Sequence, residues 1–195
     1  MAEPLYLGLD LSTQQLKAVL VTPELKVERS VVFDFDKDAP DFATKKGVLT
    51  NDAEREVVAP VGMWLRALDC VLERLSEEGE GGEGGVDLGR VKGVCGAGQQ
   101  HGSVYWSRDG VDKLGTMEKG KGMEEQLKEA FSWDKSPNWQ DASTGVQCEA
   151  FERALGGEEE LARVTGSRAH HVGLFTFSFS LDVKGCEGGK KGYGG

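Results

Sequence analysis

The sequence has no long apolar run and a shortage of basic residues, and each shortage excludes a class of protein. None of its apolar runs approaches the roughly 18 residues that a membrane-spanning helix needs, so we expect no membrane partner. Lys and Arg number 23 against 33 Asp and Glu, which gives a formal net charge of −10 at pH 7. Because nucleic-acid binding depends on Lys and Arg that neutralise phosphates, we expect no nucleic-acid partner either.

Three common ligand-binding motifs are also absent from the sequence. The Gly-x-x-x-x-Gly-Lys-Ser/Thr motif of P-loop enzymes does not occur. Gly96 and Gly98 could begin a dinucleotide-binding Gly-x-Gly-x-x-Gly motif, but His101 stands where its third glycine belongs. The three histidines and four cysteines lack the spacing of zinc ligands, so we expect no zinc site.

The cysteines and the first residues indicate the compartment. Cys70, Cys95, Cys148 and Cys186 are far apart in the sequence, and their settings predict reduced, mostly buried thiols. The segment Met1–Pro4 lacks the basic start and apolar core of a signal peptide. We therefore expect a cytoplasmic protein.

Alternating apolar segments at the start of the chain predict strands at residues 5–9, 16–21 and 27–35, joined by short turns into an antiparallel meander. Apolar residues at steps of three and four predict a helix over residues 60–75. The apolar segment 91–98 follows this helix, and a strand after a helix after a meander is predicted to run parallel to the first strand. The fold class is therefore α/β, with a mixed sheet and flanking helices.

The other segments give weaker patterns. We expect a surface loop at residues 34–41, a brief edge segment at 47–52, a mobile low-complexity connection at 77–85 and a strand at 104–106. Helices are predicted at 123–131, at 143–155 with Ser143 as the cap, and at 158–164, with a loop at 133–141. Alternation at 175–181 predicts a half-buried strand.

The turn between the first two strands is unusually rich in polar groups for a connector. It carries Asp10, Ser12, Thr13, Gln14 and Gln15. A carboxylate such as Asp10 can hold a hydrated cation, hydroxyls can donate to phosphate, and backbone N–H groups in a tight turn can bind an anion. The alternative is a polar hairpin tip that binds nothing.

A second polar group follows the predicted strand at 91–98. Gln99, Gln100 and His101 lie at its carboxyl end, where open α/β sheets bind ligands. An amide and an imidazole can donate to and accept from adjacent hydroxyls of a polyol. The alternative is a histidine with a purely structural role.

These two groups together resemble those of the FGGY carbohydrate kinases, and within them the eukaryotic, fungal-type D-xylulose kinases. The resemblance is carried by Asp-x-Ser-Thr-Gln-Gln-x-Lys at 10–17, Gly-Ala-Gly-Gln-Gln-His-Gly-Ser-Val-Tyr-Trp at 96–106, Asn-Trp-Gln-Asp at 138–141 and Leu-Ala-Arg-Val-Thr-Gly-Ser-Arg-Ala at 161–169. It extends in order from residue 5 to about residue 171.

The resemblance implies an actin-like ATPase fold built from ribonuclease-H-like domains. It implies transfer of the γ-phosphoryl group of ATP to O5 of D-xylulose, with Mg²⁺. Residues Asp10, Ser12, Thr13, Gln14 and Gln15 would form the hairpin that faces the phosphates of ATP, with Asp10 near the metal. His101 and Gln100 would contact the sugar, and Trp139 and Asp141 would lie in a loop near it.

The resemblance stops after residue 171. Val172 stands where the family has a sugar-contacting arginine, and the general-base aspartate and second domain of the family have no counterpart here. We expect an incomplete sugar-kinase domain at residues 1–171 and a non-homologous, disordered Gly/Lys-rich tail at 172–195, derived from an unspliced intron or a frame shift. By family the protein is a xylulokinase, but we expect this chain itself to be inactive.

Two alternatives remain. The chain could be a non-catalytic fragment that at most binds a sugar. It could also belong to a chaperone or cytoskeletal ATPase with the same fold, against which the Gln-Gln-His motif argues. The sequence carries no signal for the oligomeric state.

Overall fold

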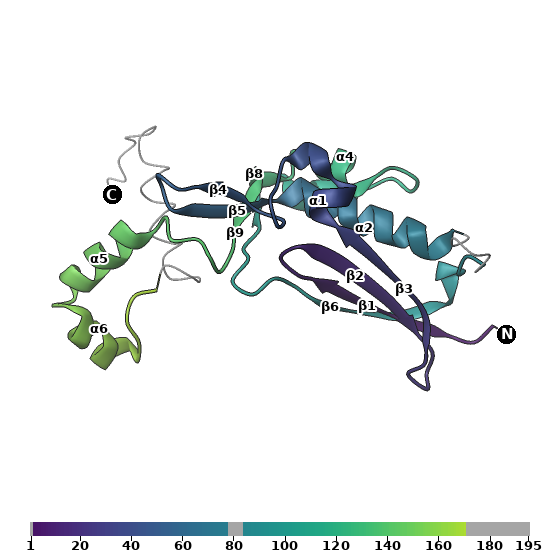
Figure 1. Ribbon diagram of the computed structural model, residues 1–195, viewed down its shortest axis with the longest axis horizontal. Helices are drawn as coiled ribbons and strands as arrows, with labels where there is room; N and C mark the ends of the chain where they lie inside the picture. The colour runs from purple at the N-terminus through teal and green to yellow at the C-terminus, as the bar shows by residue number, and fades with distance from the viewer. Residues whose placement is uncertain (1, 78–83, 171–195) are drawn as a thin grey trace, which may run out of the picture. The chain divides into compact units, whose positions relative to one another are not determined.

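The computed structural model describes residues 2–77 and 84–170 (Figure 1). The described residues divide into two compact units, with residues 2–49, 58–77 and 84–136 in unit 1 and residues 50–57 and 137–170 in unit 2. The predicted domain boundary at residue 171 falls at the end of the described residues and stays a prediction. The predicted strand at 175–181, the predicted tail and most of the low-complexity connection lie outside the described residues.

Unit 1 is built on a four-stranded mixed sheet. Strands β1 (Leu5–Leu11), β2 (Gln15–Val21) and β3 (Val27–Asp34) form the predicted antiparallel meander. Strand β6 (Val91–Ala97) pairs with β1 in parallel, which gives the order β3-β2-β1-β6. The predicted α/β class and the parallel pairing are thus confirmed. The parallel pairing brings the carboxyl ends of β1 and β6 to the same edge of the sheet.

Helix α2 (Val61–Ser76) supplies the other half of the core (Figure 1). The predicted apolar stripe is confirmed, and Pro60 is the N-cap residue rather than the first helical residue. The helix packs its stripe on the face of the sheet that carries the buried side chains of the meander. The shared cluster includes Leu5, Leu16, Leu20, Phe33, Met63, Ala67, Val71 and Leu75. Burial of this apolar surface, rather than helix propensity, holds the layers together.

The prediction of a surface loop at residues 34–41 is wrong. A one-turn helix, α1 (Phe35–Asp38), and a 3₁₀ turn, η1 (Pro40–Phe42), occupy this segment. Asp34 caps α1 by accepting a hydrogen bond from the backbone N–H of Lys37 at 3.1 Å. Phe35 is fully buried in the core, so an apolar anchor and a cap order a stretch whose acidity pointed to a loop.

The remaining elements of unit 1 are short. The 3₁₀ turn η2 (Leu88–Arg90) precedes β6, and β7 (Tyr105–Trp106) pairs antiparallel with β8 (Phe131–Trp133). Helices α3 (Gly110–Gly115) and α4 (Met123–Leu127) lie between them in sequence. The predicted helix over 123–131 therefore ends four residues early, because Phe131 enters a strand. Cys95 is exposed, against prediction, whereas Cys148 is buried and Cys70 is half-buried.

A three-stranded sheet has the order β4 (Leu49–Asn51), β5 (Glu56–Pro60) and β9 (Lys135–Pro137). Strand β4 confirms the predicted edge segment, whereas β8 and β9 take part of the predicted 133–141 loop. Unit 2 carries helices α5 (Gly145–Ala154) and α6 (Glu158–Thr165). The predicted Ser143 cap is wrong: Thr144 is the N-cap residue of α5. Within the described residues, no helix is long and apolar enough to cross a membrane.

Candidate ligand-binding site

The tip of the β1–β2 hairpin, defined here as residues 12–15, is shaped by its own backbone. The N–H and the hydroxyl of Ser12 both donate to the carbonyl oxygen of Gln15 at 3.0 Å. Thr13 and Gln14 therefore stand at the apex of the turn. No hydrogen bond joins either of these two side chains to another described residue, so both remain available for a ligand.

Gln99 joins the hairpin tip to the carboxyl end of β6. Its amide Nε2 donates to the carbonyl oxygen of Ser12 at 2.9 Å. The other amide atom, Oε1, is buried and has no hydrogen-bond partner among the described residues. The sequence places Gln99 in the Gln-Gln-His group, but only Gln100 and His101 were assigned to the sugar. The contact of Gln99 with the hairpin tip depends on the pairing of β6 with β1, two residues before it.

Gln100 and His101 occupy a tight turn beyond Gln99. The N–H of Gly102 donates to the carbonyl oxygen of Gln99 at 3.2 Å and closes this turn. His101 adopts φ 60°, in the left-handed region that is uncommon outside glycine, and both Gln100 and His101 are exposed. Strained backbone of this kind often occurs at functional sites, where surrounding structure enforces it. Through Gln99, the structure brings this predicted pair next to the hairpin tip.

Asp10 lies near the end of β1, directly opposite Lys17 on β2 and beside Ala97 on β6. It is exposed. Within the described residues, no cluster of three or more His, Cys, Asp or Glu side chains is arranged to hold a metal ion. A single exposed carboxylate fits Mg²⁺, which keeps several waters and takes other ligands from substrate phosphates. Asp10 therefore fits the hydrated Mg²⁺ that the sequence resemblance implies.

In unit 2, the two predicted residues differ in exposure. The Trp139 side chain is 53% exposed, whereas Asp141 is 4% exposed. The carboxylate of Asp141 accepts hydrogen bonds from the N–H of Val57 at 2.9 Å and from the hydroxyl of Ser143 at 2.8 Å. Trp139 is thus exposed, and Asp141 stabilises the loop that carries it.

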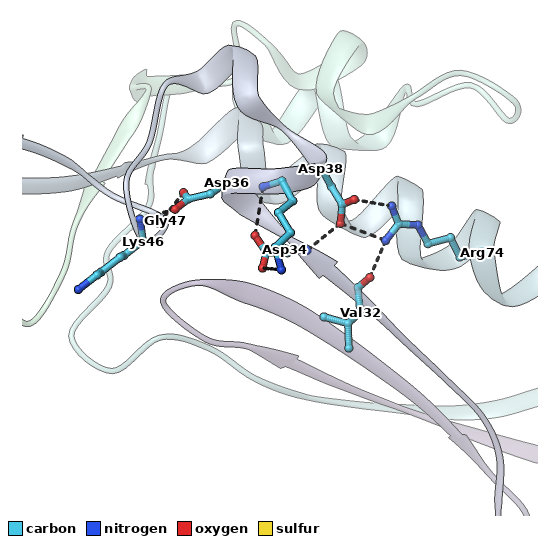
Figure 2. Close-up of polar contacts among 8 residues, drawn as sticks. Val32, Asp34, Asp36, Asp38, Lys46, Gly47 and Arg74 are labelled. Carbon is cyan, nitrogen blue, oxygen red and sulfur yellow. Dashed lines mark hydrogen bonds and ion pairs between the residues drawn. The ribbon is translucent and has the colours of Figure 1, made fainter.

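Charged groups on α1 surround the end of β3 in unit 1 (Figure 2). Arg74 pairs with Asp38 at 3.1 Å and also donates to the carbonyl oxygen of Val32. Burial alone would raise the pKa of Asp38, but hydrogen bonds and the charge of Arg74 outweigh it, so its pKa lies below the usual value. The same pairing raises the pKa of Arg74.

Unit 1 also contains a cavity of about 670 Å³ that contains none of the predicted site residues. Its walls mix apolar and charged side chains, including Phe42, Pro60, Leu65, Glu124, Lys128 and Phe131. The predicted site is thus an exposed edge of the sheet rather than this cavity.

Fungal proteins resemble the chain in sequence over most of its length. Probable D-xylulose kinase A of Aspergillus clavatus is 56% identical over 168 residues, which is 86% of this chain and 28% of that protein. Probable D-xylulose kinase A of Arthroderma otae is 54% identical over 169 residues, which is 87% of this chain and 29% of that protein. The chain thus spans less than a third of the relatives it matches. No family model matches it.

Solved structures resemble the fold. A gluconate kinase from Lactobacillus acidophilus gives a TM-score of 0.63 at 14% identity, covering 95% of this chain and 30% of its own. A ligand-bound xylulose kinase from the same organism gives a TM-score of 0.62 at 15% identity, and the match covers 94% of this chain and 29% of that protein. Plasmodium falciparum glycerol kinase gives a TM-score of 0.54 at 13% identity, and the match covers 95% of this chain and 30% of that protein. The fold is that of the FGGY sugar kinases, and the predicted actin-like ATPase fold is confirmed.

Proposed function

Because this chain is a homologue of part of the fungal D-xylulose kinases, we propose that it is the N-terminal, sugar-side part of an ATP-dependent kinase that phosphorylates D-xylulose at O5. The observation that carries the proposal is the hydrogen bond from Gln99 to Ser12. It couples the turn of Gln100 and His101 to the hairpin tip at one sheet edge. A kinase needs a phosphate-binding group and a sugar-binding group side by side.

The hairpin tip would bind the phosphates of ATP. Thr13 and Gln14 present free side chains at its apex, Ser12 and Gln15 fix its shape, and the backbone offers further donors. Asp10 would hold the hydrated Mg²⁺, which neutralises phosphate charge and orients the γ-phosphoryl group. In phosphoryl transfer, positioning and charge neutralisation supply most of the catalysis.

The sugar would be contacted in unit 1 by His101 and Gln100. His101 and Gln100 can donate to and accept from adjacent hydroxyls of a ketose. Trp139 offers an exposed ring face for the apolar side of the sugar, and Asp141 would contribute through the loop that it fixes. The protein would act in D-xylose degradation in the cytoplasm.

We assign turnover to a complete kinase rather than to this chain alone. Phosphoryl transfer also needs a base that takes the proton of the sugar O5 hydroxyl, and no described residue of this chain is assigned that role. We therefore expect the 195-residue chain to bind ligands without transferring phosphate. The alternatives are a non-catalytic fragment that at most binds a sugar, and an actin-like ATPase of another class, which would be indifferent to pentoses.

Calorimetric titration of the chain with D-xylulose tests the proposal. We expect saturable binding that weakens by about tenfold in His101→Ala, since a lost hydrogen bond to a bound hydroxyl costs about 1.4 kcal/mol. Leu25→Ala is the matched control, because Leu25 is 80% exposed in the β2–β3 turn, at the end of β2 away from the tip. Equal affinity of the wild type and His101→Ala for the sugar would contradict the role of His101. Binding of no pentose at all would contradict the proposed function.

A further inference from the structure

The carboxylate of Asp36, on helix α1, collects hydrogen bonds from one loop (Figure 2). Its Oδ1 accepts from the hydroxyl of Thr44 at 2.8 Å and from the N–H of Gly47 at 3.0 Å. Its Oδ2 accepts from the N–H of Lys46 at 2.5 Å. All three donors belong to residues 44–47, named here the bracing loop, so one side chain determines the path of this loop.

The bracing loop needs such an acceptor, because its backbone is unusual. Lys46 has φ 56° and Gly47 has φ 77°, two consecutive residues in the left-handed region. For a residue with a side chain this conformation is unfavourable, and it persists where other contacts stabilise it. Successive N–H groups in such a bend point to one side and form a site for an anion. Here the anion is the protein's own carboxylate.

The backbone of the bracing loop lies in close contact with the hairpin tip at Gly47. A Cβ atom placed on Gly47 would lie 1.9 Å from the carbonyl oxygen of Thr13 and 3.0 Å from the ring of Phe35. On the same side, the N–H of Phe35 donates to the carbonyl oxygen of Gln14 at 3.0 Å. Helix α1 therefore reaches the tip by two routes, directly through Phe35 and indirectly through Asp36 and the bracing loop.

We propose that Asp36 is a positioning residue for the hairpin tip: it fixes the bracing loop, and the loop keeps Thr13 and Gln14 in the orientation that meets phosphate. The phosphate part of this statement rests on the proposed function, whereas the positioning part does not. Asp36 is exposed on α1 and touches no ligand group itself.

The ionisation of Asp36 agrees with this role. Its small degree of burial would raise the pKa, but the hydrogen bonds from Gly47, Thr44 and Lys46 outweigh burial, and the pKa lies below its usual value. The side chain is therefore a carboxylate at neutral pH, with acceptors only. In Asp36→Asn, one acceptor becomes an NH₂ group that cannot accept from a backbone N–H.

Amide hydrogen exchange by NMR on the 195-residue chain tests the positioning. The probes are the N–H groups of Gly47, in the bracing loop, and Ser12, at the tip. For Asp36→Asn we expect both to exchange about tenfold faster, the effect of losing one charge-assisted hydrogen bond. The ratio of the exchange rates of variant and wild type should stay the same at low denaturant concentrations, because local opening exposes little surface. If the substitution instead acted through global stability, exchange would depend on denaturant concentration.

Asp38→Asn is the matched control. Asp38 lies on the same helix and accepts from the N–H of Asp34 and from Arg74, but it does not contact the bracing loop (Figure 2). It should leave exchange at Gly47 and Ser12 within about twofold of wild type. Faster exchange at Gly47 with unchanged exchange at Ser12 in Asp36→Asn would overturn the proposal. So would an equal effect of the two variants on Ser12.

Two further measurements keep the result decisive. If Asp36→Asn fails to fold, Thr44→Val removes one of the three hydrogen bonds to Asp36 and should accelerate amide exchange at Ser12 by about threefold; no acceleration overturns the proposal.

Calorimetric titration with Mg·ATP then separates the two proposals. Weaker binding in Asp36→Asn than in Asp38→Asn supports both. A wild type that does not bind Mg·ATP counts against the proposed function, while the exchange data still decide the positioning.

Discussion

The hairpin tip of unit 1 and the loop at Asn138–Asp141 of unit 2 both carry predicted ligand-binding residues, but they are stabilised in opposite ways. The tip is held through its carbonyl oxygens, where Ser12 accepts from Gln99 and Gln14 accepts from Phe35. Its apical side chains are therefore left free. In the loop of unit 2, the side chains of Asn138 and Asp141 also accept stabilising hydrogen bonds, beside those of the backbone.

The two aspartates illustrate the difference. Asp10 is exposed and has no hydrogen-bond partner on its side chain among the described residues, whereas Asp141 is 4% exposed and accepts from two donors. A carboxylate that is already hydrogen bonded within the protein costs more to redirect toward a ligand. We infer that the tip binds ligand through side chains, and that the unit 2 loop presents Trp139 on a rigid support.

The largest expected effect on stability comes from Asp141→Ala. It leaves the partly buried N–H of Val57 and the hydroxyl of Ser143 without their acceptor and should lower the free energy of unfolding of unit 2 by about 2–3 kcal/mol. Asp10→Ala should change the free energy of unfolding by less than about 0.5 kcal/mol, because the side chain is exposed. Denaturant unfolding of both variants measures the difference. Equal destabilisation by the two substitutions would remove the distinction between these regions.

The second effect concerns the approach of Gly47 to the tip. Gly47→Ala places a Cβ against the carbonyl oxygen of Thr13 at a residue with φ 77°, so we expect destabilisation of about 2–3 kcal/mol in unit 1. Gly120→Ala is the matched control, because Gly120 has φ 82° and open space around its Cβ position. It should cost only about 1 kcal/mol, the conformational part alone. Similar losses in the two variants would show that the Gly47–Thr13 contact is not tight.

A small effect on stability should come from Gln99→Leu. The substitution removes the stabilising hydrogen bond to Ser12, but it also removes the destabilising buried Oε1 that has no partner. The two contributions partly cancel, so the free energy of unfolding should change by less than about 1 kcal/mol. The affinity for Mg·ATP should nevertheless fall by several-fold, since the tip loses a support. Gln100→Leu, at an exposed position, serves as the control for Mg·ATP binding. Unchanged Mg·ATP affinity in Gln99→Leu would show that this bond does not position the tip.

Much of the sheet of unit 1 could be predicted from the sequence, because its signals are local. Alternation with short turns gives the meander, and the apolar stripe of Val61–Ser76 gives α2. The short elements were harder to predict. The acidic stretch after Asp34 becomes a helix because Phe35 is buried in the core. In addition, Arg74 forms an ion pair with Asp38, although the two residues are 36 positions apart in the sequence.

The candidate site was predicted where it depends on motifs and missed where it depends on long-range contacts. Asp10, Thr13 and His101 stand in recognisable motifs next to strand ends. In contrast, the role of Gly47 depends on a contact with Thr13, and that of Asp36 depends on the bend of the bracing loop. Neither contact leaves a periodic signal in the sequence, so only the structure could reveal it.

We propose that this chain supplies phosphate-binding and sugar-binding residues of a D-xylulose kinase. The most direct measurement is the kinase activity of a chimera, in which this chain's matching 168 residues replace those of the Aspergillus clavatus protein. We predict ATP-dependent phosphorylation of D-xylulose by the chimera, with kcat/KM lowered about 100-fold in its His101→Ala variant. A folded chimera that binds Mg·ATP but does not phosphorylate D-xylulose would contradict the account.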